Sequence, residues 1–321
     1  MTEFIMVIPR GATGGTELGH QLIHVINSNT NYKGYILYYP FNDDYQITEE
    51  FKKYNCQIIN TKRISNFKNP VIILPEVLTY LQRKFKDYRT ALWWMSVDNY
   101  FGSISWKYAI GNKFLPLSFV KKESLKKCFD AHFYQSEYAR MFLDSMGCMR
   151  KYPLSDFLNN EYLESSFSSN KKKDIVLYNP AKGAEISRAI IEKAPDIEFR
   201  ALKGLTREEV KILMSESKVY IDFGNHPGKD RIPREAAIMG ACVLVGLKGS
   251  AANSLDVPIP DEYKFKFSNG SIDVDSLIKK IRSIFKNYEN CSREFESYRS
   301  SIQNEPKNFL LDVNRIVDAF K

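Results

Sequence analysis

Several glycine-containing loops of this 321-residue chain carry residue types that hold phosphate groups. The first, Pro9-Arg-Gly-Ala-Thr-Gly-Gly-Thr-Glu17, lies between an apolar run at 4–8 and a segment of helical periodicity at 18–26. A glycine turn that enters a helix presents free backbone NH groups and the positive end of the helix dipole to an anion. Its spacing matches neither the GxGxxG dinucleotide fingerprint nor the GxxxxGKS/T phosphate loop, so a plain tight turn is an equal alternative.

The second loop belongs to the segment 222–240, which follows a strand expected at 219–223 and enters a helix that starts near Pro233. It carries three cations, namely Lys229, Arg231 and Arg234. Ligands of open α/β sheets bind beyond the carboxyl ends of the strands, so we interpret these cations as an anion site. Glu235, in the first turn of that helix, either accepts a hydrogen bond from a sugar hydroxyl or only favours the helix dipole.

Two further loops add polar groups to the same predicted sheet edge. Asn179-Pro-Ala-Lys-Gly183 follows a strand expected at 174–178 and contributes Lys182. Gly246-Leu-Lys-Gly-Ser250 follows a strand expected at 242–247 and contributes Ser250 with its backbone NH groups. Each is weak evidence alone, but together they add to the predicted anion site.

An aromatic motif, Leu92-Trp-Trp-Met-Ser-Val-Asp-Asn-Tyr-Phe-Gly102, permits two interpretations. Sugar CH faces stack on aromatic rings while carboxylate and amide groups bind hydroxyls, which would make Trp93, Trp94, Asp98 and Asn99 a carbohydrate site. Alternatively the tryptophans pack in a buried strand and Asp98 caps the next turn.

His20 and His24 have the spacing of two helical metal ligands, with Glu17 one turn earlier. The sequence is not HExxH and no third ligand cluster follows, so we predict no metal site.

Apolar strand-like runs alternate with segments of helical periodicity in both halves of the chain, which predicts an α/β protein with two doubly wound, Rossmann-like domains. The polar stretch 151–173 is the expected linker, and 308–321 is an expected closing helix. We therefore predict an N-terminal domain at 1–165 and a C-terminal domain at 166–321 that includes the final helix. The remaining expected strands lie at 34–39, 57–60, 71–74, 91–95, 132–135 and 197–202, and the remaining expected helices at 78–88, at 186–193 and from Thr206, where Glu209 completes a capping-box pattern.

Composition and charge narrow the class of protein. With 44% apolar and 26% charged residues, the chain is neither collagen-like nor wholly disordered. Residues 51–150 hold 17 basic and 7 acidic residues, so this segment has a net charge of +10, which exceeds the net charge of +8 of the whole chain. This excess, which includes an amphipathic basic helix expected at 78–88, is either ordinary solvated surface or a surface for anionic lipid. No nucleic-acid-binding module is recognisable. Five cysteines without a CxxC pattern, and no long apolar run, predict a cytoplasmic protein.

Three short motifs carry a resemblance to a known family. They are Gly14-Gly15-Thr16-Glu17, Asn179 to Gly183, and Arg234-Glu-Ala-Ala-Ile-Met-Gly240, which resembles the segment Glu-Ala-Met-Ala-Cys-Gly. With two doubly wound halves, the chain resembles the GT-B glycosyltransferases, in particular the group-1 or family-4-like enzymes of bacterial polysaccharide and lipopolysaccharide assembly.

This resemblance implies two Rossmann-like domains that face each other across a cleft, with the donor nucleotide mainly on the second and the acceptor on the first. A sugar would pass from a nucleotide-diphosphate sugar to a saccharide or lipid-linked acceptor, with no metal or other cofactor. Gly15 would approach the donor phosphates, Lys182 with Arg231 or Lys229 would neutralise the leaving diphosphate, and Glu235 would hold the ribose. The implied donor site also includes Gly14, Thr16, Arg234 and Ser250. Partners would be the nucleotide sugar and the acceptor. The basic excess at 51–150, and not the resemblance, suggests an anionic surface at the inner face of the membrane as a further partner.

The sequence departs from the family at one position. Family-4-like enzymes carry two glutamates eight positions apart, but Pro227 stands eight positions before Glu235. Retaining and inverting stereochemistry therefore both stay open. An inverting enzyme needs a general base, for which Asp98 is the candidate, followed by His20 or Glu17. Trp93, Trp94 and Asn99 would bind the acceptor. The competing interpretations are a nucleotide-sugar epimerase on the same fold and a non-catalytic nucleotide- or carbohydrate-binding protein.

Overall fold

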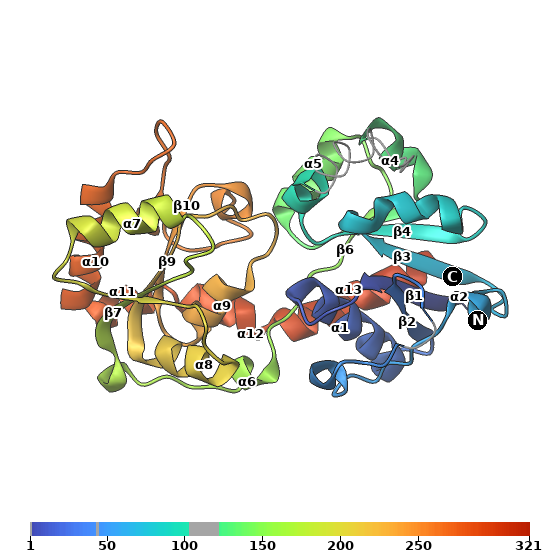
Figure 1. Ribbon diagram of the computed structural model, residues 1–321, viewed down its shortest axis with the longest axis horizontal. Helices are drawn as coiled ribbons and strands as arrows, with labels where there is room; N and C mark the ends of the chain where they lie inside the picture. Colours follow the sequence, from blue (N-terminus) through green and yellow to red (C-terminus); the bar gives the residue numbers. More distant parts are fainter. Residues whose placement is uncertain (1, 43–44, 103–121) are drawn as a thin grey trace. The chain divides into compact units, whose positions relative to one another are not determined.

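A computed structural model describes residues 2–42, 45–102 and 122–321 of the chain. The chain forms two compact units (Figure 1). The first unit comprises Met1–Asp156 together with Pro306–Lys321, and the second comprises Phe157–Glu305.

The first unit is built on a parallel sheet of six strands in the order β2-β1-β3-β4-β5-β6. The central strand β1 (Glu3–Pro9) reads Phe-Ile-Met-Val-Ile in its middle, and these five side chains are fully buried. Such a continuous apolar run is what a parallel strand needs when helices cover both faces of the sheet. The other strands are β2 (Lys33–Tyr39), β3 (Pro70–Pro75), β4 (Arg89–Trp94), β5 (Ala131–Tyr134) and β6 (Lys151–Pro153). The helical segments are α1 (Gly14–Asn29), η1 (Glu49–Phe51), α2 (Thr61–Ile64), η2 (Glu76–Phe85), α4 (Lys122–Cys128), α5 (Glu137–Ser145) and α13 (Glu305–Ala319).

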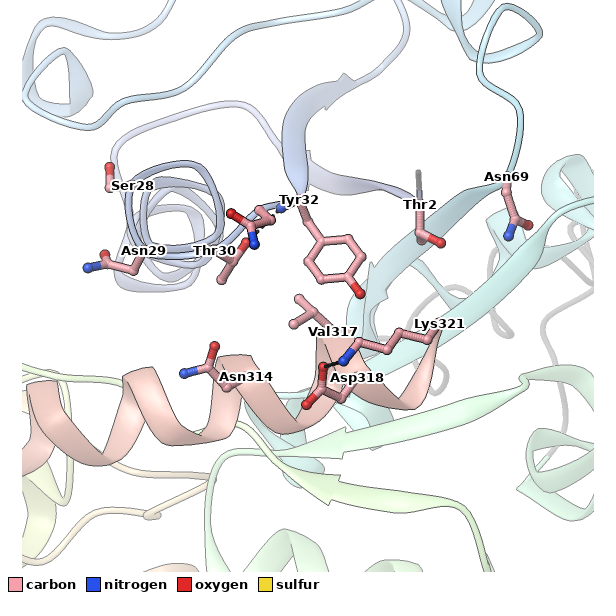
Figure 2. Close-up of a pocket in the computed structure, with 11 residues that line it drawn as sticks. Thr2, Ser28, Asn29, Thr30, Tyr32, Asn69, Asn314, Val317, Asp318 and Lys321 are labelled. Atoms are coloured by element: carbon pink, nitrogen blue, oxygen red, sulfur yellow. Dashed lines mark hydrogen bonds and ion pairs between the residues drawn. The ribbon is translucent and has the colours of Figure 1, made fainter.

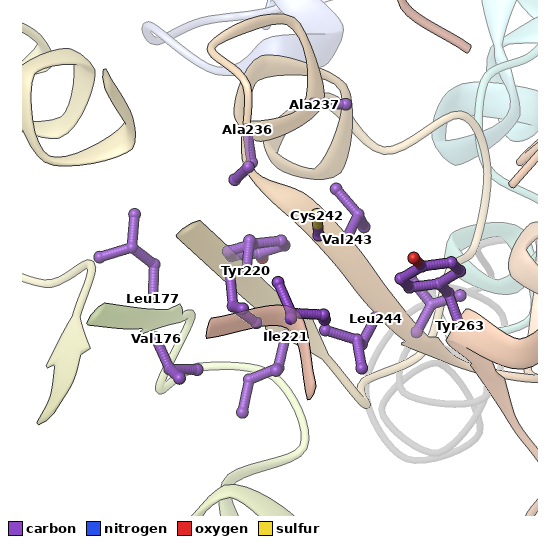
Figure 3. Packing of buried hydrophobic residues seen from close by; sticks show 14 of the residues in the cluster. Val176, Leu177, Tyr220, Ile221, Ala236, Ala237, Cys242, Val243, Leu244 and Tyr263 are labelled. Atoms are coloured by element: carbon purple, nitrogen blue, oxygen red, sulfur yellow. The ribbon is translucent and has the colours of Figure 1, made fainter. Parts of the chain in front are cut away.

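The second unit has a five-stranded parallel sheet in the order β11-β10-β9-β7-β8. Its core is formed by β7 (Lys173–Tyr178), β9 (Ser217–Asp222) and β10 (Cys242–Gly246), and Figure 3 shows buried apolar side chains from all three strands. The edge strands are β8 (Glu198–Ala201) and β11 (Lys264–Phe265). The helical segments are α6 (Asn160–Leu163), η3 (Ser169–Lys171), α7 (Ala184–Lys193), α8 (Arg207–Glu216), α9 (Arg231–Ile238), η4 (Gly249–Ala252), η5 (Asp261–Tyr263), α10 (Val274–Lys286), α11 (Tyr288–Arg293) and α12 (Glu296–Gln303).

The α/β class and the two doubly wound sheets confirm the expected fold class. Sequence patterns such as apolar runs and capping residues predicted the positions of most helices and strands that the sequence analysis named. The capping box at the start of α8 is present, with Glu209 N donating to Thr206 Oγ1 at 3.2 Å and Thr206 N donating to Glu209 Oε2 at 2.7 Å. The expected strand at 57–60 was wrong, because this segment makes only an isolated bridge between Ile36 and Ile58. The short strands β6 and β11 and the helices α10 to α12 were not predicted.

The C-terminal helix α13 belongs to the first unit, whereas the sequence predicted it as part of the C-terminal domain. Phe320, just beyond its end, is buried in the core of the first unit, where its ring packs edge-on against Phe4 and Phe133. The carbonyl oxygen of Phe320 accepts hydrogen bonds from Arg89 Nη1 at 2.9 Å and from Thr2 Oγ1 at 3.2 Å. The apolar face of the last helix thus completes the first unit, and the chain divides at 156 and 305 instead of at 165.

The predicted linker at 151–173 is largely structured. Leu154 and Leu158 are fully buried, and Lys172 is only 8% exposed. Lys172 Nζ donates to the carbonyl oxygens of Met214, Ser217 and Met239 at 2.9, 2.8 and 2.7 Å. These carbonyls lie where α8 ends and β9 begins, and where α9 ends. Burial lowers the pKa of Lys172 to about 7.

We expect Lys172→Met to destabilise the second unit by about 3 kcal/mol, because it leaves buried carbonyl oxygens without donors. The lowered pKa adds a second signature. Between about pH 7 and the ordinary lysine value of 10.5, the unfolded state binds more protons than the folded state, so this group makes stability rise with pH. The variant loses that rise. Amide hydrogen exchange of β7 and β9 measures both effects.

The matched control is Lys171→Met, which removes the same charge from an exposed neighbouring position. Equal stability of the two variants would contradict a structural role for the buried ammonium group.

Candidate functional site

The second sheet reverses its winding direction at β7. Its neighbours are β8 on one side and β9 on the other, so α7 and α8 cross to opposite faces of the sheet. Ligands of open α/β sheets bind at this switch point, beyond the carboxyl ends of the two central strands. The loops that follow β7 and β9 carry Lys182 and the segment 223–230 to this edge, as the sequence predicted.

Two glycines let these loops touch. A Cβ atom at Gly183 would lie 2.9 Å from the carbonyl oxygen of Phe223, and one at Gly224 would lie 2.5 Å from the Cβ of Lys182. Gly183 also has φ +62°, in the left-handed region, and it precedes α7 without a side-chain cap. The first turn of α7 therefore offers NH groups that no side chain of the capping residue occupies, at the point where the two loops meet.

An ionic network joins the same two loops. Lys182 Nζ lies 2.8 Å from Asp230 Oδ2, and His226 Nδ1 lies 2.8 Å from the same oxygen. His226 is fully buried, and its Nε2 lies 3.6 Å from Asp222 Oδ1. The carboxylate of Asp222 also accepts hydrogen bonds from Tyr220 Oη at 3.0 Å and from Gly224 N at 3.1 Å.

The charges of this network support one another. Burial alone would lower the pKa of His226, but the close contact of its Nδ1 with Asp230 and the charges of Asp222 and Asp230 outweigh it, so the pKa is raised. Burial alone would raise the pKa of Asp230, but His226 and Lys182 together lower it. The network therefore favours a charged imidazolium beside a charged carboxylate.

Arg234 was expected to bind the donor, but it is 1% exposed and acts inside the protein. Its Nη1 donates to Glu305 Oε2 at 2.8 Å, and its Nε and Nη2 each donate at 3.2 Å to the carbonyls of Asp230 and Lys229. Lys229 Nζ lies 2.9 Å from the other oxygen of Glu305. Glu305 thus holds two of the predicted cations, a role that sequence reasoning missed because 71 residues separate it from Arg234.

Ser250 is also structural. It is 1% exposed, and its Oγ donates to the carbonyl of Gly228 at 2.5 Å while its N donates to the carbonyl of His226 at 2.8 Å. The hydroxyl predicted to bind the donor instead fastens the loop after β10 to the loop after β9. Arg231 and Glu235, by contrast, are only half-buried on α9, which begins at Arg231.

Three of these side chains also meet the geometric requirement of a metal site. Asp222, His226 and Asp230 each place one ligand atom within 4.8 Å of the others. However, the ammonium group of Lys182 already lies against Asp230, and Asp222 accepts two internal hydrogen bonds. A divalent ion would have to displace Lys182, so this donor set does not fit a metal.

In the first unit, the glycine turn has the expected form. Gly14 and Gly15 are exposed at the start of α1, and the nearest atom to a Cβ at Gly15 would be Met95 Sδ, 3.9 Å away. Thr13 and Thr16 cap this helix reciprocally. Thr16 is 2% exposed and its Oγ1 donates to the carbonyl of Gly11 at 2.7 Å, so its hydroxyl belongs to the turn and not to a ligand.

The tryptophans predicted to bind an acceptor lie in the core. Trp93 and Trp94 are fully buried. Their indole nitrogens donate to the carbonyl of Leu154 at 3.0 Å and to His132 Nδ1 at 3.1 Å. Burial in the core accounts for the aromatic character of both positions. Neither ring is exposed, so neither offers the surface for sugar stacking that the sequence suggested.

Asp98 and Asn99 lie in a helical segment at 97–102, where Ser96 Oγ accepts a hydrogen bond from Asn99 N at 3.1 Å. Asp98 is half-buried and accepts a hydrogen bond from Tyr138 Oη at 2.9 Å, while Asn99 is exposed. Burial, together with Asp98, raises the pKa of Tyr138 to about 12. Asp98 thus keeps partial access to solvent.

Glu17 and His20, the two alternative candidates for the general base, are buried and hydrogen-bonded within the protein. Glu17 is 2% exposed and accepts a hydrogen bond from Tyr54 Oη at 2.8 Å. His20 is fully buried between the carbonyl of Thr16 at 2.7 Å and Tyr38 Oη at 2.8 Å, and burial lowers its pKa.

A buried carboxyl group that the sequence did not reveal lies close to Met95. Glu76 Oε2 accepts a hydrogen bond from Met95 N at 3.1 Å, and burial raises the pKa of Glu76 to about 7. Glu76 joins the end of β3 to the loop after β4, which precedes Asp98.

A separate polar groove of about 970 Å³ lies at the opposite, amino edge of the first sheet (Figure 2). Figure 2 shows its walls from the end of α1, the start of β1 and the last turns of α13. Asp318 and Lys321 form an ion pair there at 2.5 Å. None of the predicted site residues lines this groove.

Among the described residues, no helix is both long enough and apolar enough to cross a membrane. Neither a scan against protein-family models nor a search of curated protein sequences finds a match.

Solved structures do resemble the chain over nearly its full length. A sucrose-phosphate synthase from Thermosynechococcus elongatus aligns with a TM-score of 0.69 and 11% identity, covering 99% of both chains. The Anabaena protein HepE, solved with UDP and glucose, aligns with a TM-score of 0.64 and 10% identity over 99% of this chain and 98% of that one. The lipopolysaccharide outer core galactosyltransferase WaaB gives a TM-score of 0.61 and 10% identity, covering 97% of this chain and 99% of that one. These likenesses show that the chain has the GT-B fold of the glycosyltransferases that its motifs resemble.

Proposed function

We propose that this chain is a glycosyltransferase that moves a sugar from a nucleotide-diphosphate sugar to a saccharide or lipid-linked acceptor. The observation that carries the proposal is the switch point of the second sheet, where Lys182 meets Asp230 beside the uncapped first turn of α7. The three similar proteins named above support it, because their names describe sugar-transferring enzymes or, for HepE, a complex with UDP and glucose.

The chemistry of the switch point suits a leaving nucleoside diphosphate. Negative charge develops on the diphosphate as the glycosidic bond to the donor breaks, and fixed cations and helix N-termini stabilise it without reorganisation. We assign this role to Lys182, Arg231 and the first turn of α7, with Glu235 toward the ribose. Lys229 contributes less, since Glu305 already compensates its charge. This scheme requires no metal.

His226 has a specific part in the scheme. When Lys182 turns from Asp230 toward a diphosphate, the half-buried carboxylate would keep a single charged partner. The imidazolium of His226, 2.8 Å away, keeps it compensated. Lys182 can therefore exchange partners at a lower electrostatic cost than if it were the carboxylate's only cation.

The acceptor part of the proposal rests on the first unit. We assign Gly14 and Gly15 to an approach by donor phosphates, and Asp98 to deprotonation of the acceptor hydroxyl if the reaction inverts configuration. The basic excess at 51–150 suits an anionic, lipid-linked acceptor at the cytoplasmic face of a membrane. The absence of a glutamate at Pro227 leaves the stereochemistry to experiment.

Product analysis with a panel of nucleotide-diphosphate sugars tests the reaction class. We expect the donor to be consumed only when a saccharide or lipid-linked acceptor is present. If the reaction inverts configuration, we also expect Asp98→Asn to lower kcat by about 100-fold or more, the usual contribution of a general base. Tyr138→Phe is the control, since it removes only the hydrogen bond that Asp98 accepts. Conversion of the donor to an epimer without acceptor would indicate the epimerase, and nucleotide binding without any turnover would indicate a binding protein.

Replacing Lys182 tests the diphosphate site directly. We expect Lys182→Ala to weaken nucleoside-diphosphate binding about tenfold or more, because it removes a charge-assisted contact. Calorimetry measures the affinity after a thermal-shift screen has identified the nucleotide. Lys193→Ala removes the same charge from the other end of α7, where Lys193 pairs with Asp275. Equal loss of affinity in both variants would place the diphosphate elsewhere.

The raised pKa of His226 predicts a pH dependence of stability. The interaction stabilises the folded unit fully below the unfolded pKa of 6.5, and it is lost as the pH rises through the higher folded value. The stability advantage of the wild type over His226→Gln should therefore shrink from pH 6 toward pH 9. Hydrogen exchange of β7 and β9, corrected for intrinsic rates, measures this difference. A constant difference across this range would mean that the imidazole is not charged beside Asp230.

A further inference from the structure

A second pocket of about 330 Å³ opens in the first unit, at the amino edge of the sheet. Its position follows from the elements that form it, since β5 begins at Ala131 and β6 begins at Lys151. The glycine turn of α1 lies at the other edge, so this pocket is separate from the site proposed above. Its lining residues are Lys126, Lys127, Phe129, Asp130, His132, Gly147, Cys148, Met149 and Arg150.

The imidazole of His132 has a defined hydrogen-bonding state. An indole nitrogen can only donate, so His132 Nδ1, which lies 3.1 Å from Trp94 Nε1, must accept. Burial lowers the pKa of His132 to about 4, which keeps the ring neutral at neutral pH. The ring hydrogen is therefore on Nε2.

Among the residues that the structure describes, none accepts a hydrogen bond from this N–H group. His132 is 2% exposed, and its Nε2 atom has no hydrogen-bond partner in the part of the chain that the structure describes. Buried donors are nearly always paired with protein, water or a ligand. His132 lines the pocket, so a molecule bound there can supply the partner that Nε2 lacks among the described residues.

The charges around this donor select an anion. Lys126, Lys127 and Arg150 are exposed around the pocket, and no ion pair joins them to a carboxylate of the described residues. Lys126 Nζ lies only 3.9 Å from where a Cβ of Gly147 would be, which places it by the α5 end of the pocket. The single lining carboxylate, Asp130, already accepts a hydrogen bond from Thr90 N at 2.7 Å.

We propose that this pocket binds a phosphate group, with His132 Nε2 donating from the buried wall and Lys126, Lys127 and Arg150 supplying charge. A single water molecule would satisfy the imidazole, but only an anion would also interact favourably with the three exposed cations. The volume exceeds that of one phosphate, so the pocket has room for a further group on a phosphate monoester or diester. This inference does not depend on the proposed glycosyltransferase activity.

Nuclear magnetic resonance tests the site on the intact chain. Inorganic phosphate is the first probe, and glucose 6-phosphate is the second. We expect saturable shifts of the His132 Nε2 signal and of the Trp94 indole N–H, which is bonded to the same ring. Trp94→Phe assigns the indole signal. Chloride at matched ionic strength should leave both signals in place, and identical shifts with chloride would overturn the proposal.

Charge-reversal variants test the cations without disturbing the core. Lys126→Glu combined with Arg150→Glu should raise the phosphate dissociation constant about tenfold or more, since both residues are exposed and line the pocket. Lys62→Glu combined with Lys68→Glu makes the same change of charge at exposed positions outside the pocket. Equal effects of the two pairs would reduce the binding to general electrostatics and refute a built site.

The phosphate could be soluble or belong to a lipid headgroup, and co-sedimentation separates these sources. Vesicles of phosphatidylcholine with phosphatidic acid are compared with phosphatidylcholine alone. Binding that Lys126→Glu with Arg150→Glu abolishes, and that inorganic phosphate competes away, identifies a headgroup. Saturable phosphate binding without co-sedimentation identifies a soluble phosphate ester. Neither phosphate nor vesicle binding would overturn the proposal.

Discussion

The carboxylate of Asp230 is the interaction on which the organisation of the second unit's site depends. It accepts Lys182 from the loop after β7 and His226 from its own loop, so two strand ends on either side of the switch point share one negative charge. Gly183 and Gly224 make this possible, because side chains at these positions would separate the two loops. Ser250 and Arg234, which the sequence predicted to bind a ligand, instead keep the loop around Asp230 in place.

The features that could be predicted from the sequence are those that depend on residues close together in the chain. The capping box of α8, the buried run of β1 and the glycine turn before α1 each depend on a few adjacent residues, and all three occur in the structure. Contacts between residues far apart in the chain could not be predicted in this way. Glu305 meets Arg234 across 71 positions, and the last helix packs on β1 and β5 through Phe320, so no local pattern marks either contact. The paired tryptophans show the same limit, since their burial follows from neighbouring strands.

Burial separates two kinds of cation that look alike in a sequence. Lys172 and Arg234 are almost fully buried and donate hydrogen bonds to backbone carbonyls, so these side chains hold the ends of helices and a loop. Lys126 and Arg150 are exposed and keep their charge available to a ligand, whereas Lys182 is partly exposed and pairs with Asp230 in the free protein. The net charge of +10 at 51–150 follows from counting alone, but only the structure shows that part of it surrounds a buried imidazole N–H.

The ion pair at the switch point also limits what a diphosphate can gain. In the free protein Lys182 is already compensated, so the ligand's affinity reflects the difference between two ion pairs and not the strength of one. The free-energy cost of that exchange depends on how well the charge of Asp230 is compensated after Lys182 has left. His226 therefore helps to determine the affinity, although it is fully buried. Buried carboxylates left without a partner are strongly disfavoured. A neutral residue at 226 would therefore hold Lys182 on Asp230, and the cation would be less available to any anionic ligand at this edge of the sheet.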